Sequence, residues 1–407
     1  MESTAAASHL SLGDRDIDRA GHLLIQFLKD YERAIPTSAA ILPTLNRSQL
    51  EELRRTPFKR AGTGIEAIFK EIQDKIVPNS TTVAHPRFLA YVLGPPNGIA
   101  PFAEAVAAAL NQNCNFWQLS PAANVIEQKV IAWLSDLFDY PAAAGGIITS
   151  GGSMATLTAL RAALCDKCPA DLRETGLQSR SAPLVLYTST EAHDSVEKAA
   201  TLLGLGSNQV RKIPVDDDFQ MRVDVLRAAI RADREAGKQP FCVVASAGTI
   251  NTGAVDPIAE LASLCREEDL WLHVDGAYGA LFVLAARTRE TLRLCGLADS
   301  IVLDPHKLLF APLEAGCLIV RDRVKLRHAF GGISSYLPAD RDPLLMNFME
   351  YGPQLSRGFK AFKIWCALEV FGVDAFARAA DPCWRWRVIS KRDFKLRMLL
   401  SYWHQSI

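Results

Sequence analysis

Seven short runs of β-branched and other apolar residues alternate with helix-forming stretches between about residues 145 and 320. Alternation of this kind predicts an α/β fold, in which helices flank a mainly parallel sheet and ligands bind at the carboxyl ends of the strands. The predicted strands are 147–149, 184–187, 210–213, 242–245, 271–274, 300–303 and 316–320.

Side chains that can take part in catalysis follow two of these predicted strands. Lys307 follows the run 300–303, and Asp275 follows the run 271–274. A lysine after a strand is most often solvated, and an aspartate there most often caps a turn. An amine and a carboxylate at two strand ends are, however, what pyridoxal 5'-phosphate requires, because a lysine holds its aldehyde covalently and a carboxylate keeps its ring nitrogen protonated. We therefore predict that Lys307 and Asp275 form a cofactor pair.

A glycine-rich turn from Gly145 to Ser153 leads into residues 154–164, a segment whose composition strongly favours a helix. Free backbone N–H groups and the helix dipole favour a phosphate at such a helix start, and glycines let the backbone approach it closely. The same pattern also occurs as an ordinary loop with a serine N-cap. The turn does not match Gly-x-Gly-x-x-Gly, and this argues against a dinucleotide-binding enzyme.

Two further polar residues follow predicted strands. His193 lies in the turn after 184–187, and Thr249 comes shortly after 242–245. A histidine in a turn usually makes a local hydrogen bond, but an imidazole can also stack on a pyridine ring and contact a substrate carboxylate. Both residues are candidates for the surroundings of the cofactor ring.

These motifs occur in a specific order: Thr188-Ser-Thr-Glu-Ala-His193-Asp-Ser-Val196, then His273-Val-Asp275-Gly-Ala277-Tyr278, then Asp304-Pro-His306-Lys307. As an ordered set they resemble the group II pyridoxal-phosphate decarboxylases, the family of aromatic-L-amino-acid, glutamate and histidine decarboxylases. The resemblance extends from about His85 to about Gly372. It implies a type I PLP-dependent transferase fold and a carboxy-lyase that releases an amine and CO2.

The resemblance also implies a role for each matching residue. Lys307 would bind the cofactor covalently, Asp275 would pair with the ring nitrogen, and His193 would stack on the ring. Ala277 would pack under the ring with Thr249 beside it. The phosphate would bind to Gly152, Ser153 and Ser300, with His306 nearby. Tyr336 corresponds to the family's mobile-loop tyrosine and would return the proton, with Gly331 and Gly332 as hinges of that loop.

The segment 85–93 matches the family's side-chain pocket in the aromatic enzymes. Tyr91, Val92 and Leu93 would form an apolar wall, and Phe116 would add to it from the other subunit. The resemblance therefore favours an aromatic L-amino acid such as tyrosine, tryptophan or dihydroxyphenylalanine. Leu308 and Asp304 stand where the aromatic enzymes commonly have Trp and Asn, so an acidic or a diamino acid remains an alternative.

Composition narrows the possible partners. The 407 residues, 49% of them hydrophobic, exceed the usual single domain, and the 45 basic and 45 acidic side chains balance. With no net charge, the chain lacks the positive electrostatic field that would attract nucleic acid or an anionic membrane surface. We find no apolar stretch of about 20 residues and no secretory signal.

Nine scattered cysteines are typical of free thiols in a reducing compartment, so we expect a cytoplasmic protein. Cys165 and Cys168 have metal-ligand spacing but no second pair, and we predict no metal.

The expected organisation has three parts. Residues 1–80 form a helical arm with an amphipathic segment over 16–33, residues 81–372 form the large PLP-binding domain, and residues 373–407 are the remnant of a small carboxyl-terminal domain. An amphipathic arm buries its apolar face against another surface, and we expect a C2 homodimer. After about residue 380 the resemblance ends in a basic, aromatic tail. A cofactor-binding but inactive protein, or a truncated gene product, therefore remains the alternative from a different class.

Overall fold

The computed structural model describes residues 10–37, 41–43, 46–88, 90–168, 172–331 and 346–381. Contacts between Cα atoms divide the chain into two units, Met1–Pro95 and Pro96–Ile407. The described part of the first unit contains helices and turns but no strand. Its helices are α2 (Asp14–Ala34), α3 (Arg47–Arg55) and α4 (Ile65–Glu71), with short helical turns at Ile35–Thr37, Ile72–Ile76 and Val77–Asn79.

Helix α2 carries the amphipathic segment. It contacts α4, and Arg19 on α2 forms an ion pair with Glu66 on α4. Ile17, Leu24 and Ile25 remain exposed on α2. The arm therefore keeps apolar surface that its own unit does not cover.

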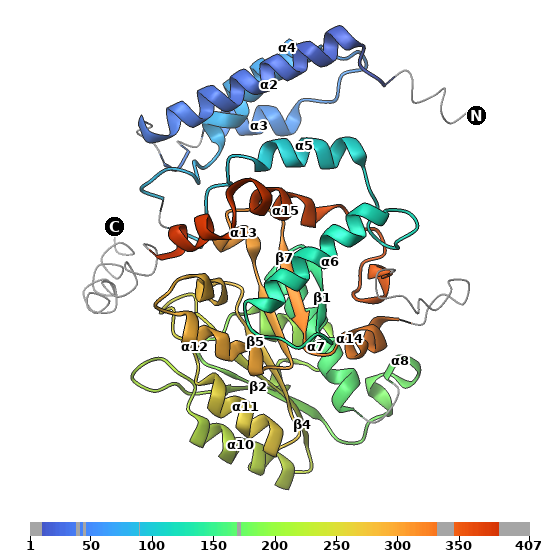
Figure 1. Ribbon diagram of the computed structural model, residues 1–407, viewed down its shortest axis with the longest axis vertical. Helices are drawn as coiled ribbons and strands as arrows, with labels where there is room; N and C mark the ends of the chain where they lie inside the picture. The colour runs from blue at the N-terminus through green and yellow to red at the C-terminus, as the bar shows by residue number, and fades with distance from the viewer. Residues whose placement is uncertain are drawn as a thin grey trace. The chain divides into compact units, whose positions relative to one another are not determined.

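The second unit is built on one seven-stranded sheet, drawn in Figure 1. Its order is β1-β7-β6-β5-β4-β2-β3. The strands are β1 (Gly145–Thr149), β2 (Leu184–Ser189), β3 (Val210–Ile213), β4 (Gln239–Ser246), β5 (Trp271–Asp275), β6 (Ser300–Leu303) and β7 (Gly316–Val320). All seven predicted strands are present, each within a few residues of its predicted bounds.

Strand direction brings the motif residues to one edge. Strands β2, β3, β4, β5 and β6 run parallel, whereas β7 runs antiparallel to both β6 and β1. The carboxyl ends of β1, β4, β5 and β6 therefore lie at the same edge as the amino end of β7, where Thr149 pairs with Gly316 and Leu303 pairs with Cys317. The fold class is confirmed, with β7 as the antiparallel member of the mainly parallel sheet.

Helices pack on this sheet and cover its strands (Figure 1). Helix α7 contacts β1, β7, β6, β5 and β4, while α10 and α11 pack together on β4, and α6 packs on β1 and β7. The helices of this unit are α5 (Ala100–Leu110), α6 (Pro121–Asp136), α7 (Gly152–Lys167), α8 (Leu172–Thr175), α9 (Ser195–Leu202), α10 (Val223–Glu235), α11 (Ile258–Glu267), α12 (Arg289–Arg293), α13 (Pro305–Leu308), α14 (Arg323–Phe330) and α15 (Lys360–Phe371). Short 3-10 turns lie at Leu177–Ser179, Ser207–Gln209, Ala280–Leu284, Leu294–Leu297 and Phe348–Glu350.

The central strands are buried along their whole length. Every residue of β2, β6 and β7 is buried, and β4 is buried from Pro240 to Ser246. Continuous burial explains why these strands read as apolar runs rather than as alternating patterns, because helices cover a parallel sheet on both faces. In the part of the chain that the structure describes, no helix is both long and apolar enough to cross a bilayer.

Candidate active site

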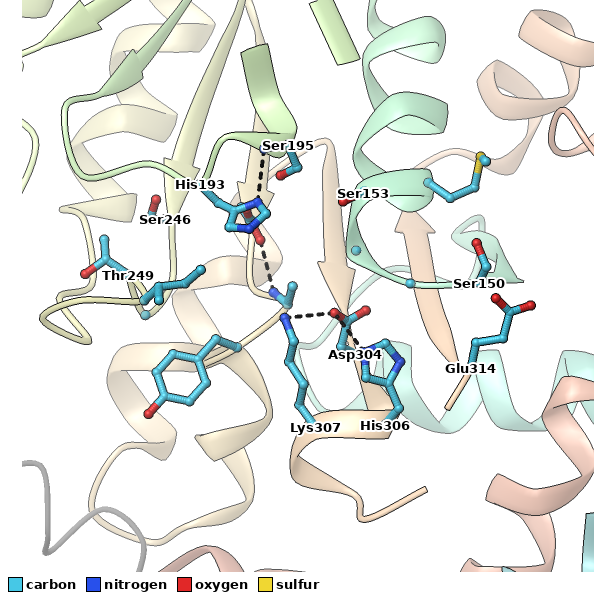
Figure 2. Close-up of a pocket in the computed structure, with 18 residues that line it drawn as sticks. Ser150, Ser153, His193, Ser195, Ser246, Thr249, Asp304, His306, Lys307 and Glu314 are labelled. Atoms are coloured by element: carbon cyan, nitrogen blue, oxygen red, sulfur yellow. Dashed lines mark hydrogen bonds and ion pairs between the residues drawn. The ribbon is translucent and has the colours of Figure 1, made fainter. Parts of the chain in front are cut away.

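A pocket of about 320 Å³ opens at the carboxyl edge of the sheet. That volume is at the lower end of the range for small-molecule sites. Residues that follow β1, β2, β4, β5 and β6 line it, so chain segments far apart in the sequence converge there (Figure 2). The lining residues are Ser150, Gly151, Gly152, Ser153, Met154, His193, Ser195, Ser246, Gly248, Thr249, Ile250, Asp275, Ala277, Tyr278, Asp304, His306, Lys307 and Glu314.

Lys307 lies on the one-turn helix α13, directly after β6. Its backbone N–H donates to the Asp304 carbonyl at 2.8 Å, and its Nζ lies 3.0 Å from Asp304 Oδ2 (Figure 2). The Lys307 side chain is 21% exposed, whereas that of Asp304 is 2% exposed. The amine is therefore held in place and still reachable from the pocket.

Asp275 is the last residue of β5, and its carboxylate Oδ1 accepts a hydrogen bond from the Ala277 N–H at 3.2 Å. Gly276 between them has no room for a side chain, because a Cβ there would lie 2.4 Å from the Ala280 Cβ and 2.9 Å from the Val302 carbonyl oxygen. The tight turn fixes Asp275 and presents both Asp275 and Ala277 to the pocket.

His193 stands in the turn between β2 and α9, and its ring orientation is fixed locally. Its Nδ1 accepts a hydrogen bond from the Ser195 N–H at 3.0 Å (Figure 2). A neutral imidazole that accepts at Nδ1 carries its proton on Nε2. His193 therefore offers a donor at Nε2 to whatever binds beside it.

Helix α7 begins at the pocket without a side-chain cap, because its N-cap residue is Gly151. The first N–H groups of a helix have no acceptor within the helix, and the helix dipole makes this end positive. Gly316 at the start of β7 packs so closely on Gly151 that a Cβ at residue 316 would lie 2.5 Å from the Gly151 Cα. Ser153 in the first turn also lines the pocket. The predicted anion site is thus the uncapped start of α7, and Gly316 packs closely against its N-cap residue.

His306 faces the same helix start. Its Nδ1 accepts from the Ala315 N–H at 3.2 Å, and its Nε2 lies 3.5 Å from Asp304 Oδ2. Burial lowers the pKa of His306, and the Asp304 carboxylate opposes that shift. Thr249, on the other side of the pocket, accepts from the Ala254 N–H at 3.1 Å.

Ser300 corrects the sequence prediction. It is the first residue of β6, so it lies at the opposite end of that strand from the pocket, and it is fully buried. Its Oγ accepts from Trp271 Nε1 at 2.8 Å and lies 2.9 Å from His273 Nδ1. Four residues of extended strand span about 13 Å, so Ser300 cannot reach a phosphate bound at the start of α7.

The remaining predicted residues are not placed at this pocket. Tyr336 and Gly332 lie outside the described residues. Tyr91, Val92 and Leu93 belong to the first unit, and the Tyr91 side chain is exposed. Phe116 is half-buried in the second unit and does not line the pocket. The side-chain wall therefore stays a prediction.

Asp304 and Glu314 are acidic lining residues to which the sequence analysis assigned no role. The signal for Asp304 was available, because it directly follows a predicted strand just as Asp275 does. Glu314 precedes β7, and its position at this edge follows only from the antiparallel direction of that strand. Among the described side chains, no three His, Cys, Asp or Glu residues are grouped so that they could hold a metal ion.

Comparison with known proteins identifies the family. The pyridoxal-dependent decarboxylase conserved domain matches residues 48–391. The chain belongs to this family. It is therefore a PLP-dependent amino-acid decarboxylase. The lysine and carboxylate predicted as the cofactor pair both line the pocket.

Relatives with different substrates are about equally similar to this decarboxylase. Aromatic-L-amino-acid decarboxylase of Bacillus atrophaeus is 35% identical over 380 residues, which span 92% of this chain and 76% of that protein. L-2,4-diaminobutyrate decarboxylase of Rhizobium meliloti (strain 1021) is 36% identical over 321 residues, which span 78% of this chain and 62% of that protein. The crystal structure of Oryza sativa TDC with PLP and tryptamine matches with a TM-score of 0.82 at 27% identity, over 90% of this chain and 76% of that chain.

The pocket residues fit pyridoxal phosphate on their own chemistry. An uncapped start of a 16-residue helix suits the phosphate, and the glycines there leave room for it. Lys307 would hold the aldehyde and Asp275 would accept the ring N–H. Gly152, Ser153 and His306 would surround the phosphate, while His193, Ala277 and Thr249 line other parts of the pocket.

Proposed function

We propose that this decarboxylase acts on an aromatic L-amino acid and releases the corresponding amine and CO2. The supporting observation is the charge of the pocket: among the described lining residues there is no arginine, and Lys307 is the single lysine. Lys307 is needed for the cofactor, so a second carboxylate on the substrate would find no cationic partner there. The 35% identity to an aromatic-L-amino-acid decarboxylase supports the same substrate class.

When bound, pyridoxal phosphate supplies the electron sink that takes up the electron pair left by departing CO2. The protein's part is to hold the cofactor and to orient the substrate. Lys307 binds the aldehyde side, and the Asp275 carboxylate, fixed by the Ala277 N–H, keeps a proton on the ring nitrogen through charge attraction in a sheltered site. These two roles remain our proposal for this chain.

His193 has the position to orient the substrate. Because its Nδ1 is taken by the Ser195 N–H, its Nε2–H is the group available to a carboxylate in the pocket. Such a contact would hold the breaking bond at a fixed angle to the ring. Tyr336, outside the described residues, is proposed to return a proton to the substrate carbon after CO2 has left.

We propose that two copies of the chain assemble as a C2 homodimer. The apolar residues exposed on α2 support this assembly, because they need a further surface to cover them. The wall from Tyr91, Val92, Leu93 and the partner's contribution at residue 116 would then complete the side-chain pocket. A cytoplasmic location is part of the same proposal and rests on the odd number and scattered spacing of the cysteines in the sequence.

A diamino acid is the second candidate, and Glu314 favours it. This carboxylate lines the pocket and its side chain is half exposed, so it could attract a second ammonium group. The 36% identity to an L-2,4-diaminobutyrate decarboxylase agrees with that reading.

The experiment is CO2 release by PLP-loaded protein across a panel of tyrosine, tryptophan, dihydroxyphenylalanine, 2,4-diaminobutyrate and glutamate. We expect kcat/KM for at least one aromatic substrate to exceed that for 2,4-diaminobutyrate by about tenfold or more, a difference of about 1.4 kcal/mol in transition-state binding. A preference for 2,4-diaminobutyrate that is lost in Glu314→Gln would replace the aromatic proposal. Cofactor uptake with no CO2 from any amino acid would instead show an inactive protein.

A further inference from the structure

Asp304 places a buried carboxylate where the phosphate of the cofactor is expected. Its Oδ2 lies 3.0 Å from Lys307 Nζ and 3.5 Å from His306 Nε2. A Cβ built on Gly152, the first residue of α7, would lie 3.1 Å from the same oxygen. Asp304 therefore stands at the positive end of α7 and is held there by two basic side chains.

The second carboxylate oxygen of Asp304 has no such support. Oδ1 is buried and finds no hydrogen-bond partner among the described residues. Leaving a buried carboxylate oxygen unpaired is unfavourable, and the carboxylate depends on its Oδ2 contacts and on the helix dipole for stabilisation. In this structure Asp304 thus uses the groups that a bound phosphate also needs.

A phosphate ester at the start of α7 would bring a second anion next to Asp304. Two anions close together in a shielded site repel strongly, because little water is present to screen them. Binding of the phosphorylated cofactor would therefore add one repulsive neighbour to Asp304.

We propose that Asp304 competes with the cofactor's phosphate for the start of helix α7, and thereby makes cofactor binding weaker and more readily reversible. Asp304 is in this sense a residue that sets cofactor affinity. The inference rests on the family's use of pyridoxal phosphate and is independent of which amino acid is decarboxylated.

Asp304→Asn is the decisive variant, because asparagine keeps the shape, removes the charge and adds an N–H donor. Apo protein is titrated with pyridoxal phosphate and, separately, with pyridoxal, and binding is followed by the absorbance of the bound chromophore. Both aldehydes react with Lys307, but only pyridoxal phosphate carries the phosphate. We expect the Kd for pyridoxal phosphate to fall about tenfold or more, with less than about a threefold change for pyridoxal.

Two outcomes would overturn the proposal. An equal gain for both aldehydes would show that Asp304 only restrains Lys307, and a weaker affinity for pyridoxal phosphate would show that Asp304 helps to hold the phosphate. Glu314→Gln is the matched control, because it removes another carboxylate from the lining of the same pocket. The ratio of the two Kd values should stay unchanged in that variant, and an equal shift there would also overturn the specific role of Asp304.

Asp304→Ser provides a second test should the asparagine variant fail to fold, since it also removes the charge and is expected to shift the ratio in the same direction. Urea unfolding of each apo variant identifies a folding defect. If the wild-type chain takes up neither aldehyde, the proposed function itself is wrong. If the wild type binds pyridoxal phosphate and neither Asp304 variant binds it more tightly, only the role of Asp304 is wrong.

Discussion

The two ends of strands β5 and β6 carry similar polar residues and put them to different uses. Toward the amino ends, Trp271 and Ser300 form a buried hydrogen-bonded cluster with His273 in the middle of β5. At the carboxyl ends of the same strands, Asp275 and Asp304 face a pocket. His273 and Asp275 are two positions apart in one motif. His273 thus belongs to the buried cluster, whereas Asp275 belongs to the pocket.

The environments explain the difference. Trp271 Nε1 donates to Ser300 Oγ, which leaves the serine hydroxyl to donate to His273 Nδ1. Burial lowers the pKa of His273 to about 4, so the ring stays neutral at neutral pH. Substitutions at the amino ends should therefore change stability, whereas substitutions at the pocket end should change cofactor binding and turnover.

Lys307→Ala tests the pocket end and carries the largest expected effect. Loss of the only amine in the described lining should lower kcat/KM by roughly 10⁴-fold or more, since removal of a covalent catalyst commonly has effects of that size. Borohydride treatment should no longer fix cofactor to the protein, and this is measured by mass spectrometry. The exposed Lys129→Ala is the control and should retain both properties. Fixation of cofactor to the Lys307 variant would remove that residue from its proposed role.

The pH dependence of unfolding tests the amino-end cluster. The pKa of His273 is about 4 in the folded chain and about 6.5 when exposed, so the unfolded state takes up its proton first as the pH falls. The free energy of unfolding should consequently lose about 3 kcal/mol from this residue between pH 6.5 and pH 4. Burial raises the pKa of the Asp256 carboxyl to about 6, which acts in the opposite direction over the same range.

The difference between wild type and His273→Asn isolates the histidine, because Asp256 titrates in both proteins. Urea unfolding at several pH values should show wild type more stable than the variant near neutral pH, with the gap closing toward pH 4. A gap that stays constant over this range would mean that His273 does not titrate in the way its burial implies.

Ser300→Ala has the smallest expected effect and separates the two ends directly. It leaves the Trp271 N–H and the His273 ring without their partner, and it should reduce the free energy of unfolding by about 1–3 kcal/mol. The Kd for pyridoxal phosphate should remain that of wild type. Ser153→Ala, at the pocket end, should do the reverse and weaken cofactor binding with little change in stability. A tenfold loss of cofactor affinity in Ser300→Ala would restore this residue to the phosphate site.

Sequence patterns could predict much of this arrangement because strand ends are readable from apolar runs. Lys307, Asp275 and His193 each follow such a run, and parallel pairing brings them to one edge. Ser300 was assigned wrongly because its role was taken from the family resemblance, although the predicted strand 300–303 already places it at the end opposite Lys307. The contact between Asp304 and the start of α7 joins residues about 150 positions apart, and no local pattern encodes it.

The antiparallel direction of β7 has a mechanical consequence for the reactive amine. Lys307 lies on the connection between β6 and β7, which are adjacent strands of the sheet, and the His306 N–H donates to the Ala315 carbonyl across that connection. The segment is therefore anchored at both ends in buried strands of one sheet. Pro305 and His306 are buried beside the first of these strands, so the backbone that carries Lys307 is tied to the core while its side chain stays accessible. We expect the cofactor to bind and leave with little movement of the backbone that carries the amine.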